Sequence, residues 1–158
     1  MTNPHLSVDF LRLTEAARLA RACPQSPGAF SVGAIVFDAA GVEISRGYSR
    51  ESDPVVHAEE SALAKLNPED ERLRGATLYS SLEPCSIRAS RPRSCTQVIL
   101  DSGISRVVFA WREPDTFVAD CRGRHLLKER DVEVVEIPEL AVAAMEPNMH
   151  LLRSRRDR

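Results

Sequence analysis

Two short stretches of the sequence hold residue types that bind metals. His57-Ala58-Glu59 stands at the expected start of a helix, and Pro84-Cys85 is followed by Cys95 ten positions later. Zinc favours imidazole and thiolate ligands in a tetrahedron, and a catalytic zinc keeps its fourth position for water. His57, Cys85 and Cys95 would supply three ligands and leave that position open. The sequence therefore predicts one Zn²⁺ per chain, with a water or hydroxide as the fourth ligand.

Glu59 is expected to act beside the metal rather than to bind it. Zinc lowers the pKa of its bound water towards about 7, so a nearby carboxylate can take a proton from that water and pass it on. Neither stretch is specific alone, because His-x-Glu occurs by chance and buried free cysteines are common. Their combination, in which His57 opens a helix and Cys85 follows a strand, favours a catalytic zinc site with Glu59 as its proton carrier.

The elements expected around these residues alternate along the chain. The apolar positions of a first helix, which Ser7 can cap and which ends near Cys23-Pro24, are Phe10, Leu13, Ala17 and Ala20. Residues 31–37 and 42–48 form a predicted β-hairpin. After it, helices are predicted at 57–66, 95–100 and 122–130, and strands at 76–82, 106–111 and 132–137. This order predicts an α/β fold of three layers, in which a five-stranded mixed sheet opens with the hairpin and has helices on both faces.

The predicted fold also indicates where a site would lie. The second half of the sheet is expected to be largely parallel, and ligands of such sheets bind beyond the carboxyl ends of the strands. Leu82 ends one predicted strand, and Glu83-Pro84-Cys85 follows it directly. We therefore expect the site at this edge of the sheet.

Composition bounds the class of protein. The 158 residues, of which 43% are hydrophobic, fit one globular domain, 1–158, whose basic tail, 153–158, is expected to be disordered. The net charge of −2 gives no electrostatic footprint for nucleic acid. The sequence has no recognisable leader and no membrane-spanning run, so we expect a cytoplasmic location and reduced cysteines. Cys23 and Cys121 are then predicted to be structural or incidental thiols.

Over residues 29–139 the sequence resembles the cytidine deaminase superfamily and, within it, the pyrimidine deaminases of riboflavin biosynthesis. The resemblance rests on SVGAIV from Ser31, HAE from His57, GATLYSSLEPCS from Gly75, SRVV from Ser105, EPDTFVA from Glu113, and Asn148. It implies the three-layer fold of that superfamily and the zinc-dependent hydrolytic removal of an exocyclic amine as ammonia. In that chemistry Glu59 would protonate a ring nitrogen and later the departing amine.

The spacing of the two cysteines departs from most of that superfamily. Ordinary members have C-x-x-C, whereas nine residues separate Cys85 from Cys95. This spacer and Tyr48-Ser49-Arg50 resemble the fungal riboflavin-pathway deaminases. Bacterial bifunctional members carry a further reductase domain, so a separate protein would do the reduction here. The resemblance implies a diaminopyrimidine substrate with a ribosylamino or ribitylamino 5′-phosphate group, and it leaves the choice between these two sugars open.

A further set of residues is expected to contact this phosphorylated substrate. The set comprises Ser31, Arg50, Ser81, Glu83, Arg88 and Arg91. The arginines between the cysteines suit phosphate oxygens, because the guanidinium fork matches them. Arg50 precedes the ligand helix by only seven residues, and Ser31 lies where the first strand would approach the pocket. The resemblance positions Ser81 and Glu83 near the ring.

Alternatives to this function remain open. The same zinc chemistry could act on another pyrimidine, such as deoxycytidylate, cytosine or a specialised nucleoside. A structural zinc module that binds a partner would need a fourth ligand from Cys23 or Cys121 and would leave Glu59 without a role. Nucleic-acid and membrane partners are not expected, since the chain is weakly acidic and has only 5% aromatic residues. The resemblance also implies assembly into a homodimer or a higher homo-oligomer.

Overall fold

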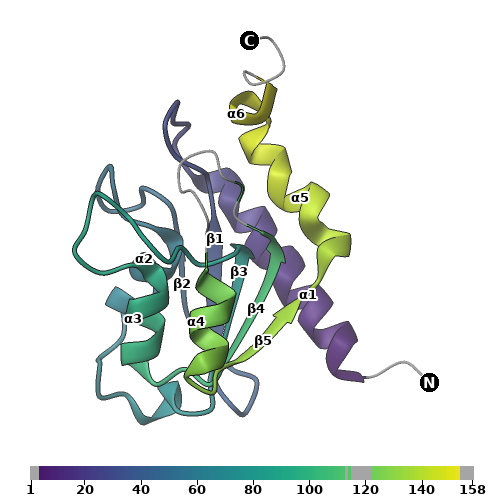
Figure 1. Cartoon of the computed structure of the whole chain (residues 1–158). Coiled ribbons are helices and arrows are strands. Elements are labelled where there is room, and N and C mark those ends of the chain that lie inside the picture. The colour runs from purple at the N-terminus through teal and green to yellow at the C-terminus, as the bar shows by residue number, and fades with distance from the viewer. Residues whose placement is uncertain (1–3, 113, 115–121, 154–158) are drawn as a thin grey trace.

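The computed structural model describes residues 4–112, 114 and 122–153. It is built on one five-stranded sheet in the order β2-β1-β3-β4-β5 (Figure 1). The strands are β1 (Gly33–Phe37), β2 (Glu43–Tyr48), β3 (Thr77–Leu82), β4 (Arg106–Trp111) and β5 (Glu133–Glu136). β1 is antiparallel to both β2 and β3, whereas β3, β4 and β5 run parallel. The predicted mixed sheet, parallel in its second half, is confirmed.

The hairpin that joins β1 to β2 is closed by Asp38. Its Oδ1 accepts hydrogen bonds from Ala40 N at 3.0 Å and from Val42 N at 2.8 Å. Gly41 has a φ of +84°, a conformation that costs glycine little because it has no Cβ. The turn therefore lies where the Asp-Ala-Ala-Gly stretch predicts it.

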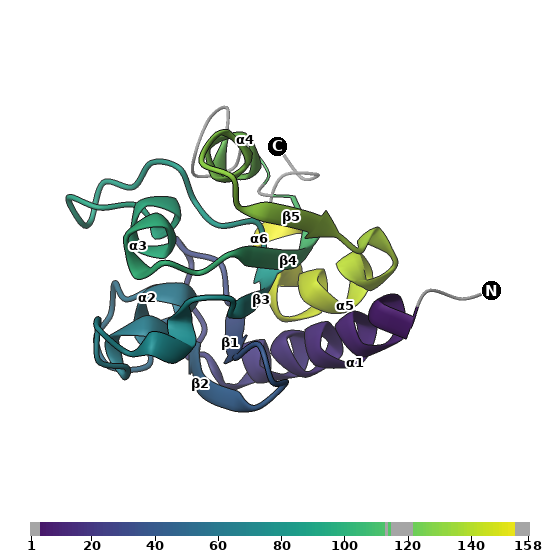
Figure 2. The ribbon, with the colours of Figure 1, turned by 90° about the horizontal axis from the view of Figure 1, so that it is seen from below.

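Helices cover both faces of the sheet (Figure 2). One face carries α2 (Ala58–Ala64), α3 (Cys95–Ser102) and α4 (Gly123–Glu129), and the other carries α1 (Pro4–Leu19) and α5 (Ala141–Met145). Each face has its own buried apolar cluster, the first containing Ile99 and Leu127 and the second Leu13 and Ala144. Because both faces are covered, β1 and β3 are almost wholly buried. The predicted three-layer α/β/α arrangement is confirmed.

The first helix differs from its prediction in two respects. It begins at Pro4 rather than at Ser7. The predicted apolar positions after the first are buried, but Phe10 is 42% exposed. Asp9 takes the inward position at this turn of the helix, because its carboxylate bonds to Tyr79 and Arg106 of the sheet.

The segment after β5 is helical, which the sequence pattern does not predict. A 3₁₀ turn (Pro138–Leu140) leads into α5, and another (Glu146–Asn148) leads into α6 (Met149–Arg153). Each turn has a proline at its first or second position, where a missing N–H costs nothing, and the prolines divide the segment into pieces too short for a periodic pattern. Arg153 is the last residue of a helix rather than the start of a disordered tail, and residues 154–158 lie outside the described residues.

The helices of the described ranges are short, and α1 is the longest with 16 residues. Other 3₁₀ turns lie at Ala20–Ala22 and Glu71–Leu73. Within the part of the chain that the structure describes, no helix has the length and apolar character needed to cross a membrane. Helices this short owe their stability mainly to packing on the sheet.

Candidate active site

The ends of three elements bring the predicted metal ligands together. His57 immediately precedes α2, Cys85 follows β3 by three residues, and Cys95 is the first residue of α3. Their ligand atoms all lie within 4.8 Å of one another. His57 Nδ1 is 3.2 Å from Cys95 Sγ and 3.6 Å from Cys85 Sγ. One imidazole and two thiols that converge on one point form the donor set of a zinc centre, so these residues fit that metal.

Gly47 in β2 allows the ligand-bearing helix α2 to approach the sheet closely. A Cβ at this position would lie 2.5 Å from Ala62 N and 2.8 Å from Ala58 O. Because both atoms belong to the backbone of α2, any side chain here would push the helix away from the sheet. His57 and Glu59, at the start of α2, are therefore held close to the end of the sheet.

The two cysteines are held together at the start of α3 despite the nine residues between them. Ser94 caps this helix, and its Oγ accepts a hydrogen bond from Gln97 N at 3.2 Å. The Cys95 N–H donates to Cys85 Sγ at 3.3 Å, and Thr96 Oγ1 donates to Cys85 O at 2.8 Å. An N–H at a helix start stabilises a thiolate, which is the form that binds metals.

The charges of the ligands are coupled. The hydrogen bond with Cys95 lowers the pKa of Cys85 to about 4, and the hydrogen bond and charge of His57 act in the same direction. The same hydrogen bond between the thiols, together with burial, raises the pKa of Cys95 well above its ordinary value. Burial alone would lower the pKa of His57, but the hydrogen bond and negative charge of Cys85 raise it. A divalent cation would stabilise both thiolates and the neutral imidazole.

Glu59 is buried beside this cluster, with 3% of its surface exposed. Its Oε1 accepts a hydrogen bond from Ser80 Oγ at 2.9 Å. Burial raises the pKa of Glu59, and the negative charge of Cys85 adds to this effect. A raised pKa makes the protonated carboxyl group easier to reach, which suits a residue that takes up and releases protons.

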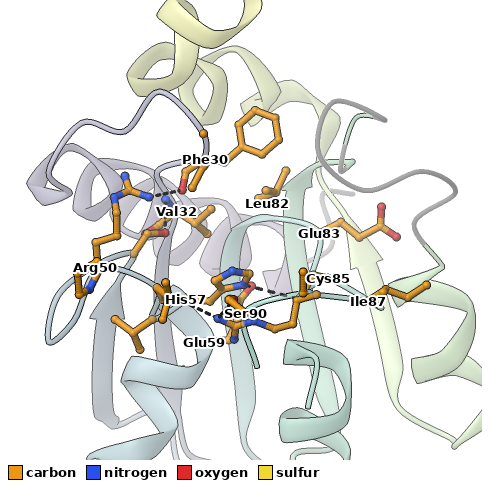
Figure 3. A pocket seen from close by; sticks show the side chains of 18 residues that line it. Phe30, Val32, Arg50, His57, Glu59, Leu82, Glu83, Cys85, Ile87 and Ser90 are labelled. Atoms are coloured by element: carbon orange, nitrogen blue, oxygen red, sulfur yellow. Dashed lines mark hydrogen bonds between the residues drawn. The ribbon is translucent and has the colours of Figure 1, made fainter. Parts of the chain in front are cut away.

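A cavity of about 330 Å³ is lined by His57, Glu59 and Cys85 and by side chains from four chain segments (Figure 3). Its apolar lining comprises Ala29, Phe30, Val32, Pro54, Val55, Val56, Leu82, Ile87 and Ala89. Pockets of this size hold small organic ligands, and apolar walls suit a planar ring. The reactive groups are thus gathered in a cavity that can admit a heterocycle.

Half of the residues predicted to contact a substrate line the cavity, namely Arg50, Glu83 and Arg88. Ser31, Ser81 and Arg91 are not among the described residues of its lining. The arginines of the spacer face carboxylates: Arg88 pairs with Glu60, and Arg91 pairs with Asp53 and Glu60. The structure therefore brings together the predicted metal ligands and Glu59, but it separates the predicted substrate residues into two groups.

Arg50 holds the segment that enters β1. It has a φ of +61°, which is uncommon for a residue with a side chain. Its guanidinium donates twice to Pro24 O, at 2.6 and 2.9 Å, and once to Phe30 O at 3.0 Å. A further hydrogen bond of 2.7 Å reaches Ser31 Oγ. These partners are all neutral, so none of the described hydrogen-bond partners compensates the charge of the guanidinium.

Ser81 and Glu83 bond to the protein backbone. Ser81 Oγ accepts a hydrogen bond from Gly33 N at 3.1 Å and so joins β3 to the start of β1. Glu83 Oε2 accepts one from Arg124 N at 3.2 Å, in the first turn of α4. Figure 3 shows the Glu83 carboxylate directed away from His57. The predicted contact of these two side chains with the ring stays a prediction.

Asn148 and Ser80 have roles that the sequence analysis does not predict. Asn148 is 1% exposed, and its amide accepts from Ser31 N at 2.6 Å and donates to Ser31 O at 3.0 Å. This fixes the C-terminal segment to Ser31, whose neighbours Phe30 and Val32 line the cavity, and a single asparagine between short helices gives no signal for such a contact. Strand alternation does give a signal for Ser80, because it lies on the same face of β3 as Leu78 and Leu82, towards α2.

Some predicted features lie outside the described residues. They are Cys121 and the EPDTFVA stretch apart from Pro114. Cys23 is described: it is a free thiol, and its Sγ lies 3.4 Å from Val32 O as a hydrogen-bond donor. It is not part of the cluster of His57, Cys85 and Cys95.

Known proteins resemble this chain in sequence and in structure. The family described as the cytidine and deoxycytidylate deaminase zinc-binding region matches residues 9–111. The diaminohydroxyphosphoribosylamino-pyrimidine deaminase of Schizosaccharomyces pombe is 42% identical over 127 residues, which cover 78% of this chain and 31% of that protein. This chain thus spans less than a third of the length of that relative.

Two solved structures have similar folds. Acinetobacter baumannii RibD, form 2, gives a TM-score of 0.79 at 25% identity, over 95% of this chain and 40% of that one. The Aspergillus oryzae Rib2 deaminase in complex with DARIPP gives a TM-score of 0.71 at 25% identity, over 95% of this chain and 98% of that one. Both likenesses include the predicted cytidine-deaminase-like fold, which is confirmed.

The family match includes the site. Residues 9–111 contain β1 to β4, the three ligands and Glu59. The match extends over more than half of the chain, and the ligands it contains converge on one point in the structure. The chain therefore belongs to the cytidine and deoxycytidylate deaminase zinc-binding family.

Proposed function

We propose that this chain is a zinc-dependent hydrolase that deaminates a diaminopyrimidine carrying a ribosylamino or ribitylamino 5′-phosphate and releases ammonia. The observation that carries the proposal is the position of Glu59 beside three zinc-type ligands in a cavity with apolar walls. A structural site closes the metal with four protein ligands, whereas the described residues bring three together and Glu59 is not part of that cluster.

The names of two relatives support the substrate class. The S. pombe relative is named as a diaminohydroxyphosphoribosylamino-pyrimidine deaminase, and the A. oryzae Rib2 deaminase is described in complex with DARIPP. The match covers 98% of the A. oryzae chain, which is a C-terminal deletion mutant. We therefore favour this substrate over deoxycytidylate, cytosine or a specialised nucleoside, and we leave the sugar form to experiment.

The residues of the site divide the work. His57, Cys85 and Cys95 would hold the zinc, which when bound supplies hydroxide at neutral pH by lowering the pKa of water. Glu59 would take one proton of the water and give it to a ring nitrogen, and it would then take the second proton, from the hydroxyl group added to the ring, and give it to the departing amine. The hydrogen bond from Ser80 holds one of its carboxylate oxygens in place during these transfers. The apolar walls would exclude bulk water and pack against the faces of the ring.

Arg50 is our candidate for the residue that meets the phosphate. Arg88 and Arg91 already face carboxylates, whereas the hydrogen-bond partners of Arg50 are carbonyl and hydroxyl oxygens. A half-buried guanidinium whose described partners are neutral attracts an anion more strongly than one that is already paired with a carboxylate. Arg50 also lines the cavity, whereas Arg91 does not.

The test of the reaction is ammonia release by the zinc-loaded protein. The candidate substrates are the diaminopyrimidine phosphate in ribosylamino and ribitylamino forms. Deoxycytidylate, cytidine and cytosine are tested separately as alternative substrates. Turnover of the diaminopyrimidine phosphate supports the proposal and identifies the sugar. Turnover of only a cytosine compound would overturn the substrate class and keep the zinc chemistry.

The metal assignment has a separate test. Purified protein should contain about one zinc per chain, and Cys85→Ser and Cys95→Ser should each remove it. Cys23→Ser is the matched control, because Cys23 lies outside the ligand cluster. Full zinc retention in both ligand variants would contradict the assignment.

The phosphate assignment is tested with two arginine variants and two substrates. Arg50→Gln should lower kcat/KM for the phosphorylated substrate about 10-fold more than for its dephosphorylated analogue. Arg91→Gln should affect both substrates equally. A larger phosphate-specific effect of Arg91→Gln would show that the spacer arginines bind the phosphate, as the sequence predicts.

The setting of the enzyme is also proposed. We propose a cytoplasmic location, because thiolate ligands need a reducing compartment, and a homodimer or larger homo-oligomer without a nucleic-acid partner. The weakly acidic net charge of −2 supports the last point. Light scattering of the purified protein measures the assembly, and a monomer at micromolar concentration would contradict it.

A further inference from the structure

The spacer between the two cysteines has two tasks. Residues 86–94 contain no helix or strand, and their last residue caps α3 just before the ligand Cys95. Four residues of the spacer, Ile87 to Ser90, also line the cavity. A spacer of nine residues has more conformational freedom than the two-residue spacer of C-x-x-C, so its shape must be fixed by contacts outside itself.

Arg88 provides the first of these contacts. Although the neighbouring Ile87 is 65% exposed, the side chain of Arg88 is only 3% exposed. It donates to Val55 O at 2.6 Å and to Glu60 Oε2 at 3.2 Å. Val55 belongs to the chain segment that forms another wall of the cavity. Arg88 therefore ties two walls of the cavity to each other and to α2.

Arg91 provides the second contact and uses the same helix residue. Its Nη2 donates to Asp53 Oδ2 at 2.5 Å, and its Nε lies 3.4 Å from Glu60 Oε1. Those last two atoms are buried and form no hydrogen bond of good geometry with each other. Their attraction is therefore between charges, and Glu60 serves as the common counter-charge of both spacer arginines.

Glu60 stands next to Glu59 in the first turn of α2. Successive residues of a helix point about 100° apart, so one carboxylate can face the ligand cluster while the next faces the spacer. The 3% exposed Glu59 contacts Ser80 of the sheet, whereas Glu60 contacts the two arginines. The same helix turn thus reaches both the proton-transfer site and the loop that carries the second thiol.

We propose that Glu60 is a positioning residue that holds the intercysteine spacer through Arg88 and Arg91, and so fixes both the cavity wall and the second cysteine ligand. Glu60 itself would touch neither the metal nor the ring. The part of this inference that concerns the substrate wall rests on the proposed function, and the part that concerns Cys95 does not.

The experiment compares Glu60→Gln with Glu71→Gln, an exposed glutamate of a 3₁₀ turn away from the spacer. The first readout is the rate at which a chelator removes zinc from the loaded protein, which needs no substrate. We expect Glu60→Gln to accelerate this release about 10-fold, the lower end of the effect of removing residues that orient metal ligands, because Glu60 acts on Cys95 through the spacer. The control should match the wild type.

The second readout is steady-state kinetics with the substrate that the ammonia-release experiment identifies. Loss of the wall should raise KM about 10-fold and leave kcat little changed, because the groups that react are still in place. Glu60→Asp keeps the charge, so its KM should stay close to the wild-type value. A general loss of structure would instead lower kcat and the melting temperature together, without rescue by aspartate.

Clear results would overturn the inference. One is a folded Glu60→Gln variant that releases zinc no faster than the Glu71→Gln control. Another is a variant whose kcat falls while its KM stays constant. If Glu60→Gln fails to fold, Asp53→Asn and Arg91→Gln, which alter more exposed groups of the same network, are judged by the same two readouts. If no substrate is turned over, faster zinc release alone still supports the role towards Cys95, so failure of the two proposals can be told apart.

Discussion

Two buried carboxylates lie at opposite ends of the same strands and are treated differently by the fold. Asp9 of α1 packs against the amino end of β3 and β4, and Glu59 of α2 lies near their carboxyl end. Each is 3% exposed. Asp9 receives two hydrogen bonds from Arg106, at 2.8 and 2.7 Å, and one from Tyr79 at 2.7 Å. Within the part of the chain that the structure describes, Glu59 accepts a side-chain hydrogen bond from the hydroxyl of Ser80, and the nearby positive group is His57.

The two environments shift the pKa in opposite directions. Burial alone would raise the pKa of Asp9, but the hydrogen bonds and charge of Arg106 and the hydroxyl of Tyr79 lower it. Burial raises the pKa of Glu59, and nearby Cys85 raises it further. A buried carboxyl group that is paired with an arginine stabilises the fold, whereas one without such a pair costs stability, which suits the proton-transfer role that we propose for Glu59. Equal solvent exposure therefore accompanies two different electrostatic environments.

The largest effect is expected from Glu59→Gln. Glutamine keeps the shape of the side chain but cannot carry a proton, so kcat should fall about 1000-fold. The free energy of unfolding should stay the same or rise, because a buried carboxyl group is replaced by a neutral amide. Ammonia release, zinc content and urea unfolding measure the three quantities. A variant that keeps a tenth or so of the wild-type kcat would remove Glu59 from the proton-transfer role.

Asp9→Asn should have the opposite profile. Asparagine leaves Arg106 without its counter-charge and presents an N–H₂ group to it, so the free energy of unfolding should fall by about 3 kcal/mol. Deamination and zinc content should not change, because the site lies at the other end of the strands. Glu15→Gln is the matched control: its partner Arg18 is exposed, and such pairs contribute at most about 1 kcal/mol. A change in kcat with Asp9→Asn would show that the two ends are coupled.

Acid sharpens the comparison further. Because the pKa of Asp9 is lowered in the folded state from its ordinary value of 3.8, its pair with Arg106 stabilises the protein above that value. This contribution is lost as the pH falls through the lowered pKa. The difference in unfolding free energy between wild type and Asp9→Asn should therefore be constant from pH 7 to about pH 5 and shrink below about pH 4. A difference that persists at low pH would mean that packing, not charge, is responsible.

The same comparison explains what the sequence could predict. Local patterns predict the alternating helices and strands. The combination of His57, Cys85 and Cys95 predicts the zinc site, because one imidazole and two thiols are typical zinc ligands. Asp9 and Arg106 are 97 positions apart, and no local pattern relates them. For the same reason the helical pattern predicts a buried Phe10 where Asp9 is buried. The sequence likewise favours phosphate as the partner of Arg88 and Arg91, because their partners Glu60 and Asp53 are distant in sequence. Long-range pairs of charges are thus the part of the site that needs the structure.

The smallest effect is expected from Tyr79→Phe, which separates the hydroxyl from the ion pair at the amino end. The Tyr79 hydroxyl donates to Asp9 Oδ1, the same oxygen that Arg106 Nη1 contacts. Because that oxygen keeps one charged donor, the variant should lose only about 1 kcal/mol of unfolding free energy, with kcat unchanged. A loss equal to that of Asp9→Asn would assign the stability of this end to the hydroxyl rather than to the arginine. The ion pair with Arg106 would then not explain the contrast with Glu59, because each carboxylate accepts a hydrogen bond from a hydroxyl and Arg106 bonds only to Asp9 of the two.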